Sequence, residues 1–436
     1  MSSPLRPPGR SRPGQVRPLQ VLRNPKIWIF PTVIVTLVVL LLSLLYMGGI
    51  VDPNGNLHRL PVGLVNADRG GELGGRQANL GAQITDSIAN AADSKPQASW
   101  RRLDLAAAER QLASGKLDGV LEVPAGFTEA VAALGSTGGG TPARPIVDVL
   151  TNPGVGSLAS SFASTINQTA AHQASLELGR SLTAAAPTVA AGTASSAARL
   201  LLADPISVSV QVGHPIGTHS GLGLTAFYYT LLLVLAGFMG GNVISNGVDV
   251  GLGYADSEIG PWHTRRPVVP INRTRTLLVK WVMSVVVAAL TSALIMLACV
   301  VVLGMDASHL WLLWVFSFCA SATVGLGVQA INAAFGGIGQ LVSMFVFIVL
   351  ALPSSGATVP LEALPGFYRW LAVFEPMRQL SGGVRAILYF DARAGAGLTR
   401  AWVMIGVGVL VALAFGLATA SYYDRKGLHR MVPEPG

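Results

Sequence analysis

The chain is too poor in charge for an ordinary soluble protein. Of its 436 residues, 12% are charged and 51% are hydrophobic, whereas about 25% of residues are charged in typical soluble domains. Its two cysteines, Cys299 and Cys319, both lie in apolar runs, which excludes a disulfide framework. The net charge of +8 is dispersed, without the basic, aromatic-rich face of a nucleic-acid-binding protein. The composition therefore predicts a membrane protein.

The chain begins with a basic segment, residues 1–26, followed by an apolar run long enough to cross a bilayer. Thr32 to Val51 contains no charged residue, and about 20 apolar residues are needed to cross the hydrocarbon layer. A cleaved signal peptide is the alternative, but its apolar core usually has only about 7–15 residues. No clean small-x-small cleavage site follows. We therefore expect an uncleaved first transmembrane helix at 27–50.

Residues 51–221 are richer in charge and turn residues and predict a small α/β domain with a helical arm. Short apolar runs bounded by turn residues predict five strands, at 60–66, 97–103, 117–123, 146–151 and 206–212. Helices are expected at 106–114 and about 157–203, the second broken near Pro187, with a linker at 135–145. The arm 157–203 is rich in Ala, Ser and Thr, and either packs on the domain or binds a partner.

Catalytic motifs are absent from this domain. It contains no Gly-x-Ser-x-Gly, no His-Glu-x-x-His and no His, Cys and carboxylate cluster with metal-ligand spacing. Its histidines are isolated from one another in the sequence: His58, His172, His214 and His219. Asn167-Gln168-Thr169 matches a glycosylation sequon, which is a common chance pattern. We expect a protein that is not an enzyme and that binds neither a metal nor a cofactor.

Residues 222–421 predict five further transmembrane helices, which makes six in the chain. They are expected at 222–247, 277–303, 310–333, 340–358 and 398–421. The run 310–358 is divided because Asn332 and the Gly-rich stretch 336–340 interrupt it. Small residues that favour close helix packing, within the chain or in a dimer, are Gly237, Gly241, Gly325 and Gly337.

Lysine and arginine residues in short flanks predict which side of the membrane each segment occupies. Six cations precede the first helix, five lie in or next to the loop 248–276, and three lie in the tail 422–436. Both termini and this loop are therefore expected in the cytoplasm of a bacterial cell, with 51–221 outside its plasma membrane. Five arginines within 359–400 are the one discordant signal.

The predicted spans carry almost no ionisable side chain, which argues against an ion-coupled carrier. Their strongly polar residues are Asn242, Gln329 and Asn332. The chain also lacks a Gly-x-x-x-x-Gly-Lys-[Ser/Thr] phosphate loop, so an ATPase that drives transport would be a separate chain. The loop 248–276 is the candidate docking site for it. The loop's candidate contact residues are Glu258, Trp262, His263, Arg265, Arg266, Arg273 and Arg275. The other interpretation is an ordinary positive-inside loop.

Closely spaced prolines in 353–397 predict a re-entrant pair of half-helices, whose backbone protein or water must cover. The residues that define the pattern are Pro353, Gly356, Pro360, Glu362, Pro365, Pro376 and Arg385. A Ser-x-Gly, a Pro-Leu-Glu-x-Leu-Pro, a Pro-Met and a following Arg in this order resemble the type-2 ABC transporter permease superfamily.

Two further segments, 60–70 (LPVGLVNADRG) and 117–127 (LDGVLEVPAGF), are similar to motifs of the phage infection protein family. The nitrosoguanidine-resistance type of membrane protein shares the same general plan. The arm 157–203 is shorter than the insertion that phage infection proteins often carry, so a role as phage receptor is not carried over.

These resemblances imply the permease subunit of an ABC-type exporter that moves an amphipathic or lipid-like substrate outward. Its partners would be a cytoplasmic ATPase that binds ATP, a second copy or paralogue of the chain, and membrane lipid. The alternative is a non-transporting envelope scaffold, which binds a partner such as a secretion machine through residues 51–221. An ion-coupled carrier is a third hypothesis.

Overall fold

The computed structural model describes residues 25–73, 75–91, 97–134, 144–185, 196–428 and 430. The chain divides into two compact units, Met1–Gly48 and Gly49–Gly436, which are described separately. Most of the basic segment 1–26, most of the linker 135–145, the break near Pro187 and residues 429 and 431–436 of the tail lie outside the described residues.

The described residues of the first unit belong to helix α2 (Pro25–Ile50), whose last two residues fall in the second unit. Its stretch Thr32–Ile50 has a mean hydropathy of 2.6, and most of its side chains are exposed. Exposed apolar side chains on all sides of a helix are stable in lipid and unfavourable in water. The helix therefore has the length and composition of a transmembrane segment.

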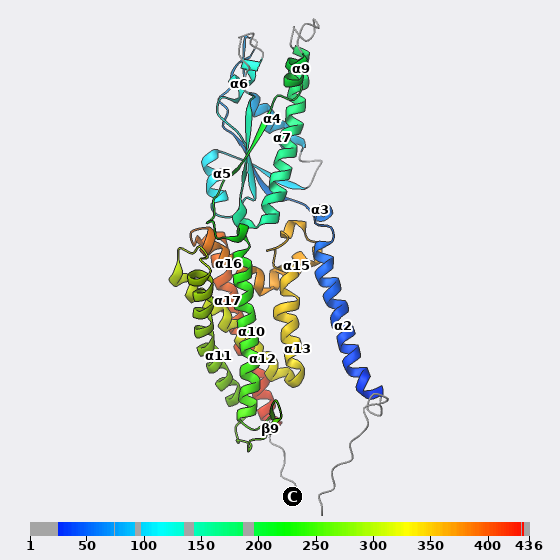
Figure 1. Ribbon diagram of the computed structural model, residues 1–436, viewed down its shortest axis with the longest axis vertical. Coiled ribbons are helices and arrows are strands. Elements are labelled where there is room, and N and C mark those ends of the chain that lie inside the picture. The colour runs from blue at the N-terminus through cyan, green and yellow to red at the C-terminus, as the bar shows by residue number, and fades with distance from the viewer. Residues whose placement is uncertain are drawn as a thin grey trace, which may run out of the picture. The chain divides into compact units, whose positions relative to one another are not determined.

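The second unit begins with a domain built on a five-stranded mixed sheet, called the sheet domain below (residues 60–212; Figure 1). Its strands are β1 (Leu60–Asn66), β4 (Ala98–Leu103), β5 (Gly119–Val123), β6 (Ile146–Thr151) and β7 (Ser207–Val212). The order is β4-β1-β5-β6-β7, in which β5 and β6 are antiparallel and all other neighbours are parallel. All five strands predicted from the sequence are present.

Helices cover both faces of this sheet because successive side chains of a strand point to opposite sides. Leu64 packs with α4 (Leu80–Ala91), α6 (Phe127–Leu134) and α7 (Ser157–Ala185). Val65 packs on the other face with α5 (Leu105–Leu112). Helix α9 (Ser196–Ala203) lies against α7. The small hairpin β2 (Gly71–Leu73) and β3 (Arg76–Ala78) completes the domain.

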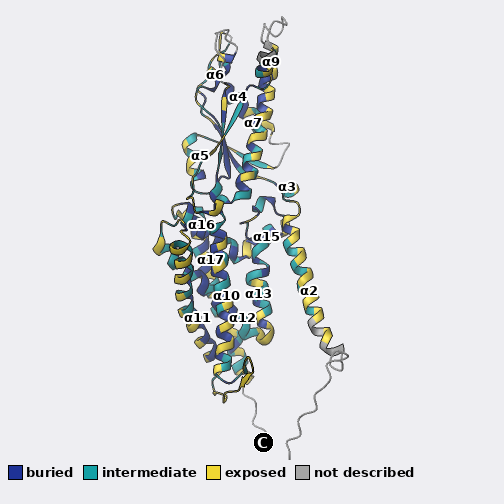
Figure 2. Ribbon diagram, in the orientation of Figure 1, coloured by how far each residue is buried: buried dark blue, intermediate teal, exposed yellow. Residues whose placement is uncertain are grey.

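The rest of the second unit is a helical bundle, called the membrane module below (residues 225–425). Its long helices are α10 (Thr225–Gly251), α11 (Arg273–Met296, continued by a π-helical stretch Leu297–Val302), α12 (Leu310–Phe335) and α17 (Leu398–Arg425). Helix α12 packs against α10, α11 and α17. The outer face of α11 is apolar and exposed at Val282, Val286 and Leu290, four residues apart (Figure 2), as expected of a helix that contacts lipid.

Within the part of the chain that the structure describes, five stretches are long and apolar enough to cross a membrane, and the predicted six-span arrangement is not established. The stretch Leu310–Ser354 counts as one of the five, although the chain reverses within it at Gly336 (φ 59°). After the reversal, α13 (Gly339–Met344) and a π-helical stretch (Phe345–Val349) return along α12 (Figure 1), and α14 (Ala351–Ser354) follows and packs against α16.

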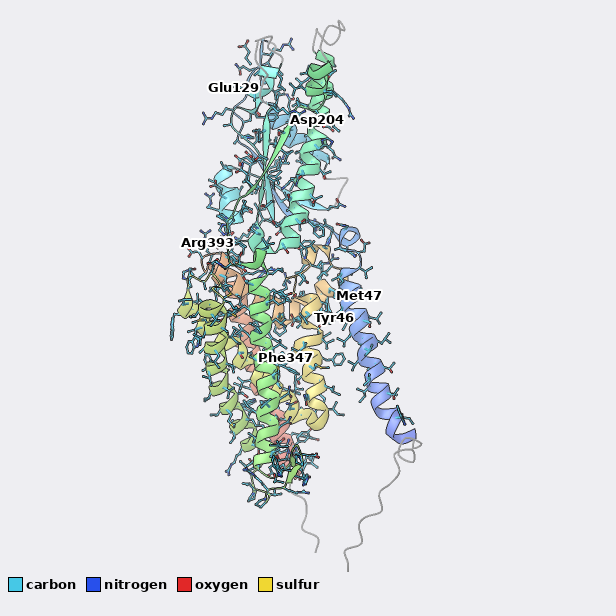
Figure 3. All side chains as sticks on the ribbon, viewed as in Figure 1. Tyr46, Met47, Glu129, Asp204, Phe347 and Arg393 are labelled. Atoms are coloured by element: carbon cyan, nitrogen blue, oxygen red, sulfur yellow. The ribbon has the colours of Figure 1, made fainter. Side chains whose placement is uncertain are left out.

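Contacts along α12 define this return. Gly339 lies against Asn332, and a Cβ atom on Gly327 would lie 2.7 Å from the ring of Phe347, which Figure 3 labels. Residues 339–354 reach only ~24 Å at about 1.5 Å per residue, less than the ~30 Å of a typical hydrocarbon layer. The expected fifth span at 340–358 is therefore not established as a membrane crossing, and its helical part ends at Ser354.

Short helices follow where the prolines predicted them. They are a 3-10 turn Leu361–Ala363, α15 (Gly366–Phe374) and α16 (Pro376–Tyr389). Pro376 occupies the first turn of α16, and the carboxylate of Glu375 caps this helix by accepting a hydrogen bond from the Arg378 N–H (3.1 Å). Proline lacks an N–H, which is unpaired in the first turn of a helix anyway.

Candidate functional site

A polar cavity of about 360 Å³ lies in the membrane module, at the end that carries the loop 252–272. Helix α10 contributes side chains at i, i+3, i+4 and i+7, which share one helix face. The lining residues are Asn242, Ser245, Asn246, Asp249, Tyr254, Asn332, Gly336, Gly337, Gln340 and Arg430. A cavity of this polarity is unusual among helices that expose apolar surface to lipid, and is the candidate functional site.

One carboxylate in this site forms ion pairs with two cationic side chains. Asp249 accepts hydrogen bonds from Lys280 Nζ (2.8 Å) and from Arg430 Nη1. Lys280 also donates to the hydroxyl of Ser245 (3.0 Å), and its side chain is only 6% exposed. A buried charge is stable only when it is paired and hydrogen-bonded. The Asp249 cluster meets this condition and retains one surplus positive charge.

A second cluster fastens α11 to α17 next to the cavity. The carboxylate of Asp424 accepts hydrogen bonds from the N–H groups of Arg273 and Thr274 (both 3.0 Å) and from the Thr274 hydroxyl (2.7 Å). The guanidinium of Arg273 donates to the Leu428 carbonyl (2.7 Å) and stacks over the Tyr423 ring. Arg273, one of the predicted docking residues, therefore joins two helix ends instead of projecting into water.

Buried amide side chains extend the polar character into the bundle. Gln329 donates to the carbonyl of Gly241 (2.8 Å), and Asn332 donates to the side-chain oxygen of Asn242 (3.0 Å). The side-chain oxygens of Gln329 and Asn332 accept no hydrogen bond from any described residue. These three amides were the strongly polar residues that the sequence placed inside the predicted spans.

An apolar cavity of about 300 Å³ lies further along α12. Residues 320–331 of α12 line it together with Phe347, Leu380 and Phe415. Asn332, the next residue of α12, and Gly336, which follows the end of the helix, line the polar cavity. The two cavities thus follow one another along a single helix.

Five predicted docking residues are exposed on or next to a β-hairpin of β8 (Ser257–Ile259) and β9 (Trp262–Thr264). They are Glu258, Trp262, His263, Arg265 and Arg266. Trp262 is 73% exposed. The carboxylate of Asp256 lies 3.5 Å from both His263 Nε2 and Arg265 Nε. Arg275 is also exposed, in the first turn of α11. The hairpin and the two arginines that follow it therefore form an accessible surface that carries charges of both signs.

Glu362 and Arg385 of the proline-rich pattern lie near Asp118, a carboxylate of the sheet domain that the sequence did not identify as a candidate. Asp118 precedes β5, and its pKa is raised to about 7 by burial and by the nearby charge of Glu362, while Arg385 and Arg101 oppose the shift. Arg385 donates to the Ala357 carbonyl (3.2 Å). The feature of the sequence that could have drawn attention to Asp118 is the Leu-Asp-Gly start of the segment 117–127. Pro353 and Gly356, by contrast, lie at helix ends.

Hydrogen bonds to backbone carbonyls join the sheet domain and the segments that flank it to the membrane module. The ring of His214 donates from Nε2 to the Tyr389 carbonyl (2.8 Å). Arg393, labelled in Figure 3, donates to the Ala113 carbonyl (3.4 Å), and the His58 N–H donates to the Glu362 carbonyl (3.0 Å). Hydrogen bonds therefore connect the membrane module directly to the sheet domain and to the segments that flank it.

Three of the four predicted packing glycines are used inside the chain. A Cβ atom on Gly237 would lie 2.5 Å from the Ser321 carbonyl oxygen, and one on Gly241 would lie 2.9 Å from Val328. Gly325 lies beside Ser284 and Gly237, whereas Gly337 has no atom near its Cβ position. The first three allow α10 and α11 to approach α12 closely.

Two further features considered in the sequence are a metal-ligand cluster and the glycosylation sequon at 167–169. Among the described residues, no group of three His, Cys, Asp or Glu side chains could hold a metal ion. The sequon residue Asn167 is fully buried between α7 and the sheet. A glycan would have no room there in the folded chain.

Residues 32–408 match the family described as "Protein of unknown function (DUF3533)". The chain is also 24% identical over 223 residues to the "Uncharacterized protein YhgE" of Bacillus subtilis (strain 168). That match covers 51% of this chain and 26% of YhgE, so the chain spans about a quarter of the length of this relative. No solved structure matches the chain. Both matches fit a membrane protein of the phage infection protein type, and since the family match extends over most of the sequence, the chain belongs to the DUF3533 family.

Proposed function

We propose that this chain is the membrane-spanning permease subunit of an ABC-type exporter and moves an amphipathic or lipid-like molecule outward. The supporting observation is the succession of a polar and an apolar cavity along α12. An amphipathic substrate needs a hydrogen-bonding place for its headgroup and an apolar place for its tail. A helix that borders both cavities is suited to such a molecule.

An ATPase in a separate chain would supply the energy and bind the ATP. Its docking surface would be the exposed hairpin 257–264 with Arg265 and Arg266. The chain itself would catalyse no reaction and bind no cofactor. A second copy or a paralogue would complete the export path, through surfaces other than Gly237, Gly241 and Gly325, which already pack within the chain.

Affinity purification of the tagged chain in mild detergent, with mass spectrometry of the co-purifying proteins, tests this proposal. We expect a stoichiometric ATPase that is lost when Arg265 and Arg266 are both replaced by Glu, because the replacements reverse the charge of the docking surface. The matched control is Arg425→Glu, which changes an exposed cation at the same end of the module. Recovery of the chain without any ATPase would contradict the proposal.

A cleft of about 180 Å³ on the sheet domain favours a second candidate function, the envelope scaffold. Helices α4 and α7 and the edge strand β4 form this cleft, and Trp100, Gln173 and Glu177 are among its lining residues. An aromatic ring beside hydrogen-bonding side chains suits the recognition of a partner. If Trp100→Ala and Gln173→Ala abolish capture of an envelope partner and no ATPase is recovered, the scaffold replaces the exporter.

A further inference from the structure

We propose that the polar cavity binds the phosphate group of an anionic membrane lipid. The inference deepens the proposed function, on which it rests for the cavity's role as a substrate site. It follows from the charges around the cavity, from the free hydrogen-bonding groups on its wall, and from the apolar cavity that lies next along α12.

The charge balance of the cavity favours an anion. Asp249 is the only carboxylate among the described residues that line it. This single negative charge is shared by Lys280 and Arg430, so one positive charge is left without a counter-charge. A surplus cation that is largely shielded from water attracts an anion far more strongly than one on an open surface.

The geometry of the wall favours a phosphate over a simple halide. The guanidinium of Arg430 is planar and can bind two oxygens of one phosphate side by side. The amide side chains of Asn246 and Gln340 are exposed in the cavity, and no described residue pairs with either of them. An arginine beside two neutral amide donors matches a group with several acceptor oxygens.

The neighbouring apolar cavity indicates a lipid as the source of that phosphate. A headgroup next to Asn332 would place its acyl chains along residues 320–331 of α12, where Phe347 and Phe415 line the wall. A soluble phosphate compound would leave this apolar space unoccupied. A lipid fills both cavities, and each buried CH₂ group contributes about 0.8 kcal/mol.

Native mass spectrometry of the purified full chain tests the inference, with equal amounts of phosphatidylglycerol and phosphatidylcholine as probes. We expect preferential retention of phosphatidylglycerol, and an affinity about tenfold lower in Arg430→Gln, since a charge-assisted bidentate contact is lost. Arg425→Gln is the matched control, because it removes an exposed cation of the same helix end that does not line the cavity. Asn246→Ala, which changes no charge, should weaken retention about threefold.

Three outcomes would overturn the inference. Equal retention of both lipids would show that the cavity does not select an anion. An equal loss in Arg430→Gln and Arg425→Gln would assign the preference to the surface charge of the whole helix end. Displacement of the lipid by glycerol 3-phosphate or inorganic phosphate at the lipid's own concentration would assign the cavity to a soluble phosphate compound.

The measurement separates this inference from the proposed function, because it requires neither an ATPase nor transport. If phosphatidylglycerol is not retained while the ATPase still co-purifies, the lipid site is wrong and the exporter stands. If the lipid is retained and no ATPase is found, the cavity is a lipid site in a protein that is not an ABC-type exporter.

Discussion

Asp118 is an unfavourably placed carboxylate at the contact between the sheet domain and the membrane module. It is 7% exposed and lies near the carboxylate of Glu362. Burial and this like charge both disfavour ionisation, so its pKa is raised to about 7. The folded chain therefore binds a proton here that the unfolded chain releases at about pH 4.

Replacement of Asp118 by Asn should stabilise the protein at high pH. A raised carboxyl pKa favours the folded state below the unfolded pKa, and this contribution is lost as the pH rises towards 7. We expect Asp118→Asn to raise the free energy of unfolding by about 2–4 kcal/mol at pH 8 and to change it little at pH 4. Thermal unfolding of the purified chain at both pH values measures this, with exposed Glu72→Gln as control. Equal effects at both pH values would contradict the assignment.

Asp68 makes long-range hydrogen bonds that could not be predicted from the sequence. In the sequence it follows the predicted strand 60–66, a position where a turn is expected and an aspartate is ordinary. In the fold, its carboxylate accepts hydrogen bonds from the Thr128 N–H and hydroxyl and from the Gly81 N–H. It thereby joins the starts of α4 and α6, which lie 13 and 60 residues away. Only the folded chain brings these donors together.

At the scale of the helices, the close approach of α10 to α12 requires glycine at position 237 but not at position 240. A Cβ atom on Gly237 would lie 2.5 Å from the Ser321 carbonyl oxygen, whereas Gly240 has no atom within 4 Å of its Cβ position. We expect Gly237→Ala to destabilise the protein by about 1–3 kcal/mol through overpacking. Gly240→Ala should be neutral or stabilise it by up to about 1 kcal/mol, because Ala is the better helix former.

Thermal unfolding of the two variants in the same detergent checks this pair. The comparison is internal, because both substitutions add one methyl group to the same helix. Equal melting temperatures for Gly237→Ala and Gly240→Ala would mean that α10 and α12 do not make the close contact described here.

Element prediction succeeded where hydrophobic pattern and turn residues agreed. All five strands of the main sheet and the long apolar helices α10, α11, α12 and α17 were predicted, because each has a long periodic or continuous apolar run. Helices α4 and α6 were missed, since their short apolar faces become evident only when they pack on the sheet. The hairpin β2–β3 was also missed, because each of its strands has only three residues.

The candidate site was predicted only in part. The sequence drew attention to Asn242, Gln329 and Asn332 as rare polar residues in apolar runs. It did not show that Asp249 and Arg430, which are 181 residues apart, form an ion pair at the cavity. Charged residues at the ends of apolar runs are usually solvated, so long-range pairing is not evident without the fold.

At the scale of the whole molecule, the predicted orientation places the sheet domain and the hairpin 257–264 on opposite sides of the membrane. Single cysteines at exposed Gln77 and Glu258, in a chain with Cys299 and Cys319 replaced by Ala, test it. In intact cells, an impermeant maleimide should label Gln77→Cys and not Glu258→Cys. After permeabilisation both should react. Labelling of both sites in intact cells would contradict the orientation.

The short return 339–354 also has a consequence for the membrane around the protein. A helical segment of ~24 Å matches a hydrocarbon layer thinner than the usual ~30 Å. Phe347 and the residues near it lie on this segment, so the lipids that contact it must tilt or shorten to cover its apolar surface. The bilayer would be locally compressed there, which lowers the work needed to draw a lipid out of its leaflet. For the exporter proposed above, thicker membranes should therefore slow transport.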